Sequence, residues 1–383
     1  MKLPAEAVLR KLFASAFFMD AGFFLLVAAL PYKVLDLGGG SLELGMMPTP
    51  SSLVYIVMTQ LVGRWSDSFG RFRMSRYGAL ALIAFAALAF QADTYWKLLL
   101  LMPLFGFGAS LFWPSIQAAI GDLSAGNAKA LVHNTGRFNV AWGVGKALGY
   151  FSAGMLLAHY SFRATFLTAI GLIAASFLFT PKEEVSSEAV EPEAAPGTDP
   201  SRGDRFRKMA WLANFASFGA SAVLANLLPE WFVNRGWPES RFGIFLGALF
   251  ALQTAVFALL ASRIRFADSV SRLLLPQLLA ALAILSLPFL PGFFSLMLIT
   301  PLIGFSFGVT YAASIYYSLH TESGKGKNAG IHESLIGASV FLFPLAGGMI
   351  VRLSGSLASP YLFMGSVMLM ALALQWVWAV KKS

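Results

Sequence analysis

Long apolar stretches separated by short polar segments run through the whole chain. Crossing the hydrocarbon core of a bilayer takes about 20 apolar residues in a helix, and the pattern predicts twelve such helices. Their expected ranges are 11–33, 41–62, 74–92, 96–120, 132–157, 161–180, 208–233, 239–262, 269–289, 292–319, 328–352 and 357–380. The first apolar run has no small-residue cleavage site, so we interpret it as a spanning helix and not as a removable signal peptide.

One polar stretch interrupts this pattern. Residues 181–207 are rich in Glu, Pro, Ala and Ser, a composition that cannot bury apolar surface, and we expect them to form a cytoplasmic linker. The linker divides the chain into residues 1–180 and 208–383, each with six predicted helices.

The two halves resemble each other in sequence, which indicates an internal duplication. Shifts of 198 and 194 residues align Gly45 with Gly243, residues 103–107 with 301–305, and Gly154 with Gly348. Because six spans return the chain to its starting side, both repeats have one orientation and are related by an axis along the membrane normal. The expected fold class is an all-α membrane protein with two pseudo-symmetric six-helix bundles.

Composition and charge support this interpretation. With 57% hydrophobic and 12% charged residues, the chain has too little polar surface to cover a soluble globule. Of its 28 lysines and arginines, 21 lie on one side of the predicted helices, six lie on the other, and Lys146 lies within a helix. Since such residues accumulate on the cytoplasmic side, we expect cytoplasmic termini in a multi-pass protein of the cell (inner) membrane.

The same distribution explains the net charge of +9 as a topology signal, so we expect no nucleic-acid partner. Cysteine is absent, which excludes disulfides and thiolate metal sites. The sequence has neither a phosphate-binding loop nor an intramembrane cluster of metal ligands. We therefore expect no enzyme activity, no cofactor and no metal.

The most specific motif lies at residues 63–73, between the second and third predicted helices. It contains the pattern G-x-x-x-D-x-x-G-R, formed by Gly63, Asp67, Gly70 and Arg71. This segment resembles the signature loop of the major facilitator superfamily, although Trp65 and Ser68 replace a Leu and an Arg that are common there. The twelve-helix, duplicated layout extends the resemblance over the whole chain.

The resemblance implies two six-helix bundles around a central cavity that opens alternately to each side of the membrane. It also implies that the loop holds a cytoplasmic gate shut, with Asp67 facing the start of a helix in the other half and with Asp67 and Arg71 linked to Asp122. Gly63 would permit close helix approach and Gly70 a tight turn. The alternative is a plain topology anchor of basic residues.

A second motif occupies residues 145–154 of the fifth predicted helix. It resembles a decayed form of the glycine-proline motif of exchangers in this superfamily, with Tyr150 in place of the Pro. Residues 102–110 of the fourth predicted helix contain no charge, whereas many proton exchangers of the family have an arginine there. Both departures weaken the case for proton-coupled export, and the glycines could equally serve close helix packing.

Charged residues inside predicted helices are candidates for a functional site, because burying charge in a bilayer is costly. Asp20 and Lys146 each lie about midway along a helix, and in the family fold both helices line the central cavity. We hypothesise an ion pair between them near the substrate, with a permanent structural pair as the alternative. His332 and Glu333 could titrate or bind cargo, although a Glu in a first helical turn also stabilises the helix dipole.

Other residues are weaker candidates. Arg137 could contact a cytoplasmic gate or lipid headgroups, and Glu230 lies where an outer gate is plausible. Further polar and aromatic residues could line the cavity, although interhelical hydrogen bonds or lipid-facing packing would also retain them. These residues are Gln60, Trp113, Gln117, Asn139, Asn214, Asn226, Gln253 and Tyr311.

The leading functional prediction is secondary active export of a small organic or amphipathic compound, driven by a proton gradient, by a monomer in the lipid bilayer. One alternative is uptake or exchange of an anionic metabolite, because Lys146 is an unusual positive charge at that depth. An alternative from another class is a non-transporting membrane sensor or scaffold. The sequence does not identify the substrate, because cargo in this fold is selected by scattered cavity residues.

Overall fold

The computed structural model of the chain describes residues 4–182, 200–260, 269–319 and 325–380. Every regular element within these ranges is helical. The twelve long helices are α1 (Ala5–Asp36), α3 (Pro48–Phe69), α4 (Arg71–Phe90), α5 (Tyr95–Leu123), α6 (Ala128–His159), α7 (Phe162–Phe179), α8 (Pro200–Asn234), α9 (Glu239–Leu260), α10 (Val270–Ser286), α11 (Phe293–Leu319), α12 (Lys325–Ser354) and α13 (Ser359–Val380). Two elements are short: α2 (Ser41–Met46) precedes α3, and the 3-10 helix η2 (Leu287–Phe289) follows α10.

Local sequence determines where several helices begin. The side chains of Thr94, Asn127 and Ser161 precede α5, α6 and α7 and accept hydrogen bonds from backbone N–H groups of the first turn, at 2.9 to 3.3 Å. Such caps satisfy donors that have no partner within the helix. The twelve predicted spans each coincide with one long helix, so the predicted helical layout is confirmed.

Differences from the prediction lie at helix ends. Helix α8 begins at Pro200, eight residues before the predicted span, while residues 183–199 of the predicted linker lie outside the described part of the chain. Ten of the twelve long helices are long and apolar enough to cross a membrane. The other two are α3 and α6, which contain more polar residues and pack against the opposite half of the protein.

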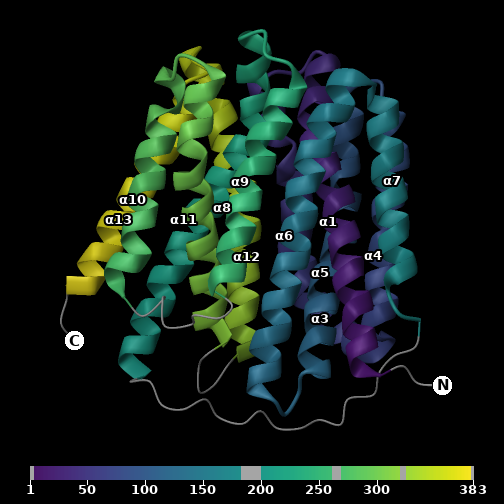
Figure 1. The fold of residues 1–383 in the computed structure, drawn as a ribbon. Helices are drawn as coiled ribbons and strands as arrows, with labels where there is room; N and C mark the ends of the chain where they lie inside the picture. The colour runs from purple at the N-terminus through teal and green to yellow at the C-terminus, as the bar shows by residue number, and fades with distance from the viewer. Residues whose placement is uncertain (1–3, 183–199, 261–268, 320–324, 381–383) are drawn as a thin grey trace.

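Two bundles with the same internal contacts make up the fold. Helices α1–α7 form the N-terminal bundle and α8–α13 form the C-terminal bundle, which lie side by side in Figure 1. In the first bundle α1 packs on α6 and α7, and α5 packs on α3 and α4. In the second, α8 packs on α12 and α13, and α11 packs on α9 and α10. The duplication detected in the sequence is therefore present in the packing.

The two chain termini lie at one end of the molecule, which we call the termini end (Figure 1). The short helix α2 and the first residues of α9 lie at the opposite end. The bundles meet along two seams: α6 packs on α9, and α2 and α3 pack on α12. These two seams border the space in which the candidate functional site lies.

Candidate functional site

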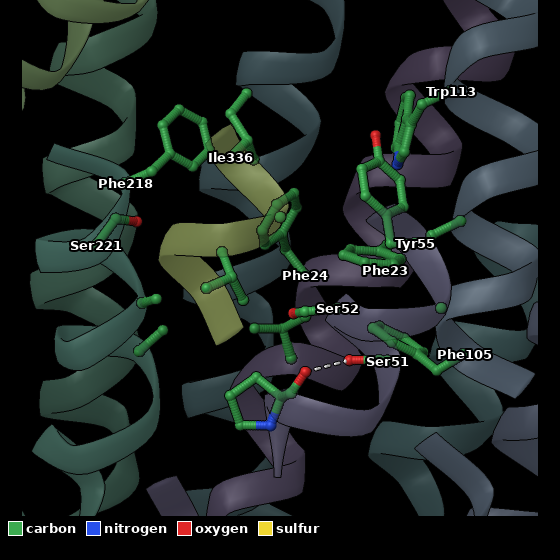
Figure 2. A pocket seen from close by; sticks show the side chains of 18 of the residues that line it. Phe23, Phe24, Ser51, Ser52, Tyr55, Phe105, Trp113, Phe218, Ser221 and Ile336 are labelled. Carbon is green, nitrogen blue, oxygen red and sulfur yellow. Dashed lines mark hydrogen bonds between the residues drawn. The ribbon is translucent and has the colours of Figure 1, made fainter. Parts of the chain in front are cut away.

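A cavity of about 250 Å³ lies between the two bundles. Its walls come from α1, α3, α5 and α6 of the N-terminal bundle and from α8, α11 and α12 of the C-terminal bundle. In Figure 2, Phe23, Phe105, Tyr55 and Trp113 form one wall, while Phe218 faces them from α8. Because both bundles contribute to the walls, relative movement of the bundles would change the shape of the cavity.

Aromatic rings dominate the N-terminal wall. Phe23 of α1 stacks on Phe105 of α5, with ring centroids 4.4 Å apart, and Phe105 also packs against the buried Phe85. Stacked rings at this separation present a rigid apolar surface to the cavity. This wall is suited to contact the apolar part of a bound molecule.

Three charged side chains line the cavity within the described part of the chain: Asp20, Lys146 and Glu333. Asp20 on α1 is 2% exposed and Lys146 on α6 is 4% exposed. The predicted ion pair is not formed, because no side-chain nitrogen and oxygen of these two residues lie within 4.0 Å. The Oδ2 atom of Asp20 is buried without a hydrogen-bond partner.

The Lys146 ammonium group lies among aromatic rings instead. Its Nζ is 3.7 Å from the ring centroid of Phe250, 4.6 Å from that of Phe24, 5.8 Å from that of Phe218 and 6.0 Å from that of Trp142. Cation–π attraction partly compensates for lost hydration. Since Phe218 and Phe250 belong to the C-terminal bundle, the ammonium group contacts both bundles.

Glu333 also connects the bundles. The Tyr55 hydroxyl of α3 donates to Glu333 Oε2 at 2.9 Å, and Gln117 Nε2 of α5 lies 3.5 Å from Oε1. Helix α12 begins at Lys325, so Glu333 is in its third turn and the first-turn dipole interpretation no longer applies. The carboxylate is instead a hydrogen-bonded group of the cavity wall.

The structure separates the remaining cavity candidates into two groups. Four of them line the cavity, namely Trp113, Gln117, Asn226 and Tyr311. Five do not, namely Gln60, Asn139, Asn214, Gln253 and His332. Gln60 is exposed and donates to Ser334 of α12 at 3.0 Å.

The other four residues outside the cavity have different surroundings. His332 is fully buried against α11, where its Nδ1 is hydrogen-bonded to the Ser314 hydroxyl at 2.8 Å. Asn139 accepts a hydrogen bond from Trp142 of its own helix at 3.0 Å. Gln253 is buried where the backbone of α9 packs against α11, and Asn214 is buried with both amide atoms unpaired.

Three of the predicted gate residues lie together: Asp67 and Arg71 of the signature loop and Asp122 of α5. Arg71 forms an ion pair with Asp67 at 3.0 Å and another with Asp122, whose Oδ1 is 3.3 Å from Nη2. Gly70 has φ of 96° between α3 and α4, a conformation that favours glycine. Asp67 is 64% exposed, and its only ion pair among the described residues is with Arg71. The expected contact of Asp67 with the C-terminal half is therefore not made by the residues described.

Two other gate predictions need correction. A Cβ atom at Gly63 would have no neighbour within 4 Å, so this glycine does not bring helices into close contact. Arg137 lies within the N-terminal bundle, where it pairs with Glu6 at 3.0 Å and covers the ring of Phe13 at 4.8 Å. It therefore joins α6 to α1 and makes no ion pair with the C-terminal bundle within the described residues.

Glycines close the end of the cavity opposite the termini. Two pairs, Gly45 with Gly348 and Gly154 with Gly243, place helix backbones in direct contact across the two seams; we call them the glycine crossings. A Cβ atom at Gly348 would lie 2.3 Å from the Ser41 carbonyl oxygen and 3.2 Å from the Gly45 Cα. One at Gly154 would lie 2.7 Å from the Gly243 Cα.

A hydrogen bond adds to this closure: the Ser41 hydroxyl of α2 donates to the Glu230 carboxylate of α8. Glu230 thus joins the two bundles at the position where the sequence suggests an outer gate.

The glycines of residues 145–154 make two kinds of contact, because Gly145 and Gly149 pack on α1 whereas Gly154 packs on α9. Close helix packing therefore accounts for all three.

Several residues of the site were not predicted. Tyr55 and the rings of Phe24, Phe218 and Phe250 contact the charged groups, but the chain has 35 phenylalanines and nothing in the sequence distinguishes these three. The glycine crossings did have a signal, because the repeat alignment pairs Gly45 with Gly243 and Gly154 with Gly348.

Solved structures share this architecture. A crystal structure of the human organic anion transporter MFSD10 (TETRAN) has a TM-score of 0.69 and 17% identity, covering 98% of this chain and 100% of that one. A bacterial homologue of the human lysosomal transporter Spinster, in an inward-facing and occupied conformation, has a TM-score of 0.75 and 14% identity, covering 99% and 98%. A mutant of the nucleoside transporter NupG has a TM-score of 0.73 and 12% identity, covering 97% and 99%.

Sequence comparison leads to the same family. Multidrug resistance protein 2 of Bacillus subtilis (strain 168) is 24% identical over 389 residues, covering 97% of this chain and 95% of that protein. The sequence profile of the Major Facilitator Superfamily matches residues 12–322, well over half of the chain. Together with the two six-helix bundles and the cavity between them, this match shows that the chain belongs to the Major Facilitator Superfamily and is a membrane transporter, not an enzyme.

Proposed function

We propose that this transporter is a secondary active exporter of a small organic or amphipathic compound, driven by a proton gradient and acting by alternating access. The cavity between the bundles carries the proposal, because it is apolar on one side, is lined by three charged side chains, two of them buried, and is closed at one end by the glycine crossings. The relation to a multidrug resistance protein supports the export direction.

The proposed orientation places the termini end in the cytoplasm and the glycine crossings on the outer face of the cell (inner) membrane. It rests on the excess of basic residues on the termini side of the helices. In this orientation the cavity is shut from the outside, as expected for a state that receives cargo from the cytoplasm. We propose a monomer as the working unit, since both bundles that define the cavity belong to one chain.

Proton coupling would use the two carboxylates of the cavity. Asp20 has a buried oxygen without a partner, and Glu333 joins the bundles through Tyr55 and Gln117. Protonating either group changes the cost of keeping it in a low-dielectric site. A proton taken up on one side and released on the other would thus favour different relative positions of the bundles.

One observation favours a second candidate function, which is uptake or exchange of an anionic metabolite. Lys146 is the only basic side chain that lines the cavity within the described residues, and it has no carboxylate partner within 4.0 Å. An anion could occupy that position. The direction of transport under a defined gradient distinguishes this candidate from export.

Reconstituted vesicles test the proposal. Purified protein in proteoliposomes is given an imposed pH gradient, and the flux of a fluorescent amphipathic dye is recorded. We expect dye movement against its gradient in the wild type and loss of that movement in Asp20→Asn. Asp93→Asn is the matched control, since Asp93 is exposed in the loop before α5 and pairs with Lys97, away from the cavity. Dye flux that ignores the pH gradient, or an Asp20→Asn variant at the wild-type rate, would refute proton-coupled export.

A further inference from the structure

Two opposite charges in the cavity attract each other but form neither an ion pair nor a hydrogen bond with each other, although their helices touch. Asp20 Oδ2 is buried without a hydrogen bond, and the Lys146 ammonium contacts aromatic rings and no carboxylate. Buried ionic groups are normally paired and hydrogen-bonded, because desolvation is otherwise uncompensated. This unmet demand on both residues indicates that a bound molecule completes the site.

Helix packing explains why the two residues do not pair with each other. Gly145 of α6 lies directly against α1, where a Cβ atom would be 3.1 Å from the Asp20 Cβ and 2.3 Å from the Phe17 carbonyl oxygen. Lys146 is the next residue, so its side chain leaves α6 about 100° further round the helix. Its ammonium lies between the ring of Phe250 on the C-terminal bundle and the ring of Phe24 on α1. The two charged groups therefore border one cavity without reaching ion-pair distance.

Charge balance restricts what can fill the space between them. An anion without a basic group would satisfy Lys146 but would lie near the Asp20 carboxylate, whose free oxygen still lacks a donor. A cation without an acidic group would satisfy Asp20 but would lie near the Lys146 ammonium. Like charges in a low-dielectric site repel strongly. A molecule that carries both an acid and an amine meets both demands and adds no net charge to the cavity.

The remaining walls define the rest of this molecule. Beside the two charges lie Phe24 and the stacked rings of Phe23 and Phe105, which offer apolar surface to a flat hydrophobic group. We infer that the transported compound is a small amphipathic zwitterion, whose acidic group binds Lys146, whose amine binds Asp20 and whose apolar part packs on the aromatic wall. This inference rests on the proposed transport function and specifies its substrate class.

Three ligands with one indole ring test this inference by calorimetry on the purified, full-length protein at neutral pH. Tryptophan carries both charges, tryptamine only the amine, and indole-3-propionate only the acid. We expect tryptophan to bind with a Kd lower by about tenfold or more than either analogue, because each analogue loses one charged contact. In Lys146→Ala this preference over tryptamine should vanish, and in Asp20→Asn the preference over indole-3-propionate should vanish. Asp93→Asn should retain both preferences.

Other outcomes overturn the inference. If tryptamine or indole-3-propionate binds as tightly as tryptophan, the site recognises a single charge. If none of the three binds, or if both variants keep the wild-type preferences, the two residues do not select a zwitterion. The dye-flux assay reports separately on transport. If the binding preference for tryptophan is absent while dye flux follows the pH gradient, the zwitterion inference is wrong and the proposed function stands. Thermal unfolding of each variant without ligand verifies that it is folded.

Discussion

Replacing Gly348 by alanine should open the cavity at the end opposite the termini. The added Cβ atom would lie 2.3 Å from the Ser41 carbonyl oxygen, whereas unstrained contacts between such atoms begin at about 3.5 Å. The backbones of α2 and α12 must therefore separate locally by roughly 1 Å. Overpacking of this kind costs about 1–3 kcal/mol. Under the proposed alternating access this contact is lost when the end opens, so the cost shifts the equilibrium towards the open state.

A shift of about 1–3 kcal/mol corresponds to a change of roughly 5- to 150-fold in the ratio of open to closed molecules. The chain has no native cysteine, so a single Ser221→Cys substitution in the cavity wall gives a reporter without background. The assay measures how fast a membrane-impermeant maleimide, added at the end opposite the termini, labels this position. We expect Gly348→Ala to accelerate labelling within that range, provided that the closed state predominates in the unmodified protein.

A matched substitution separates opening from a general effect of alanine. Gly171 lies on α7, where a Cβ atom would have no neighbour within 4 Å, so Gly171→Ala should leave the labelling rate unchanged. Gly154→Ala tests the second glycine crossing and should act in the same direction as Gly348→Ala. Unchanged labelling in a well-folded Gly348→Ala protein, or equal acceleration in Gly171→Ala, would show that the glycine crossings do not control access.

Three further predictions concern stability. Gly70→Ala should lower the unfolding free energy by about 1 kcal/mol, because alanine is strained at φ of 96°, whereas Gly63→Ala should not destabilise; chemical denaturation compares them. Gln277 of α10 and Gln375 of α13 form a reciprocal hydrogen-bonded pair, so Gln277→Leu or Gln375→Leu alone should lower the unfolding free energy by about 1–2 kcal/mol. The double variant leaves no unpaired amide and should recover most of that loss in a double-mutant cycle. Arg137→Ala should cost under about 1 kcal/mol by the same measurement, because its ion pair is partly exposed.

The membrane fold was predictable because a bilayer leaves the backbone little choice. Every spanning segment must satisfy its own hydrogen bonds, so apolar length alone locates the helices. Helix ends were less predictable where helices continue beyond the apolar region. Helix α1 begins at Ala5 and α8 at Pro200, in segments whose charged residues resemble loops when only hydropathy is considered.

The site was partly predictable for a similar reason. Asp20, Lys146 and Glu333 are identified as charges within or near apolar runs, and all three line the cavity. Adjacent residues on a helix point about 100° apart, and of His332 and Glu333 only Glu333 lines the cavity. Which of them does so depends on the rotation of α12 about its axis. That rotation is determined by packing, chiefly against α8, α2 and α3, which a single sequence does not reveal.

The partners of the charged residues were beyond prediction for a different reason. The Lys146 ammonium is surrounded by rings from four helices, two of them in the other bundle. Each ring belongs to an ordinary apolar run and carries no local pattern of its own. Only the relative placement of the bundles turns these rings into a site.

The glycine crossings also carry information about the origin of the molecule. Gly45 touches Gly348, and their counterparts in the other repeat, Gly243 and Gly154, touch each other in the same way. Reciprocal contact of this kind defines an isologous interface between two identical subunits. The geometry is that of a homodimer of six-helix chains, with each subunit presenting the same two glycines to its twin. Fusion of such a pair into one polypeptide would preserve the contact while freeing each copy to acquire different charges around the shared pocket.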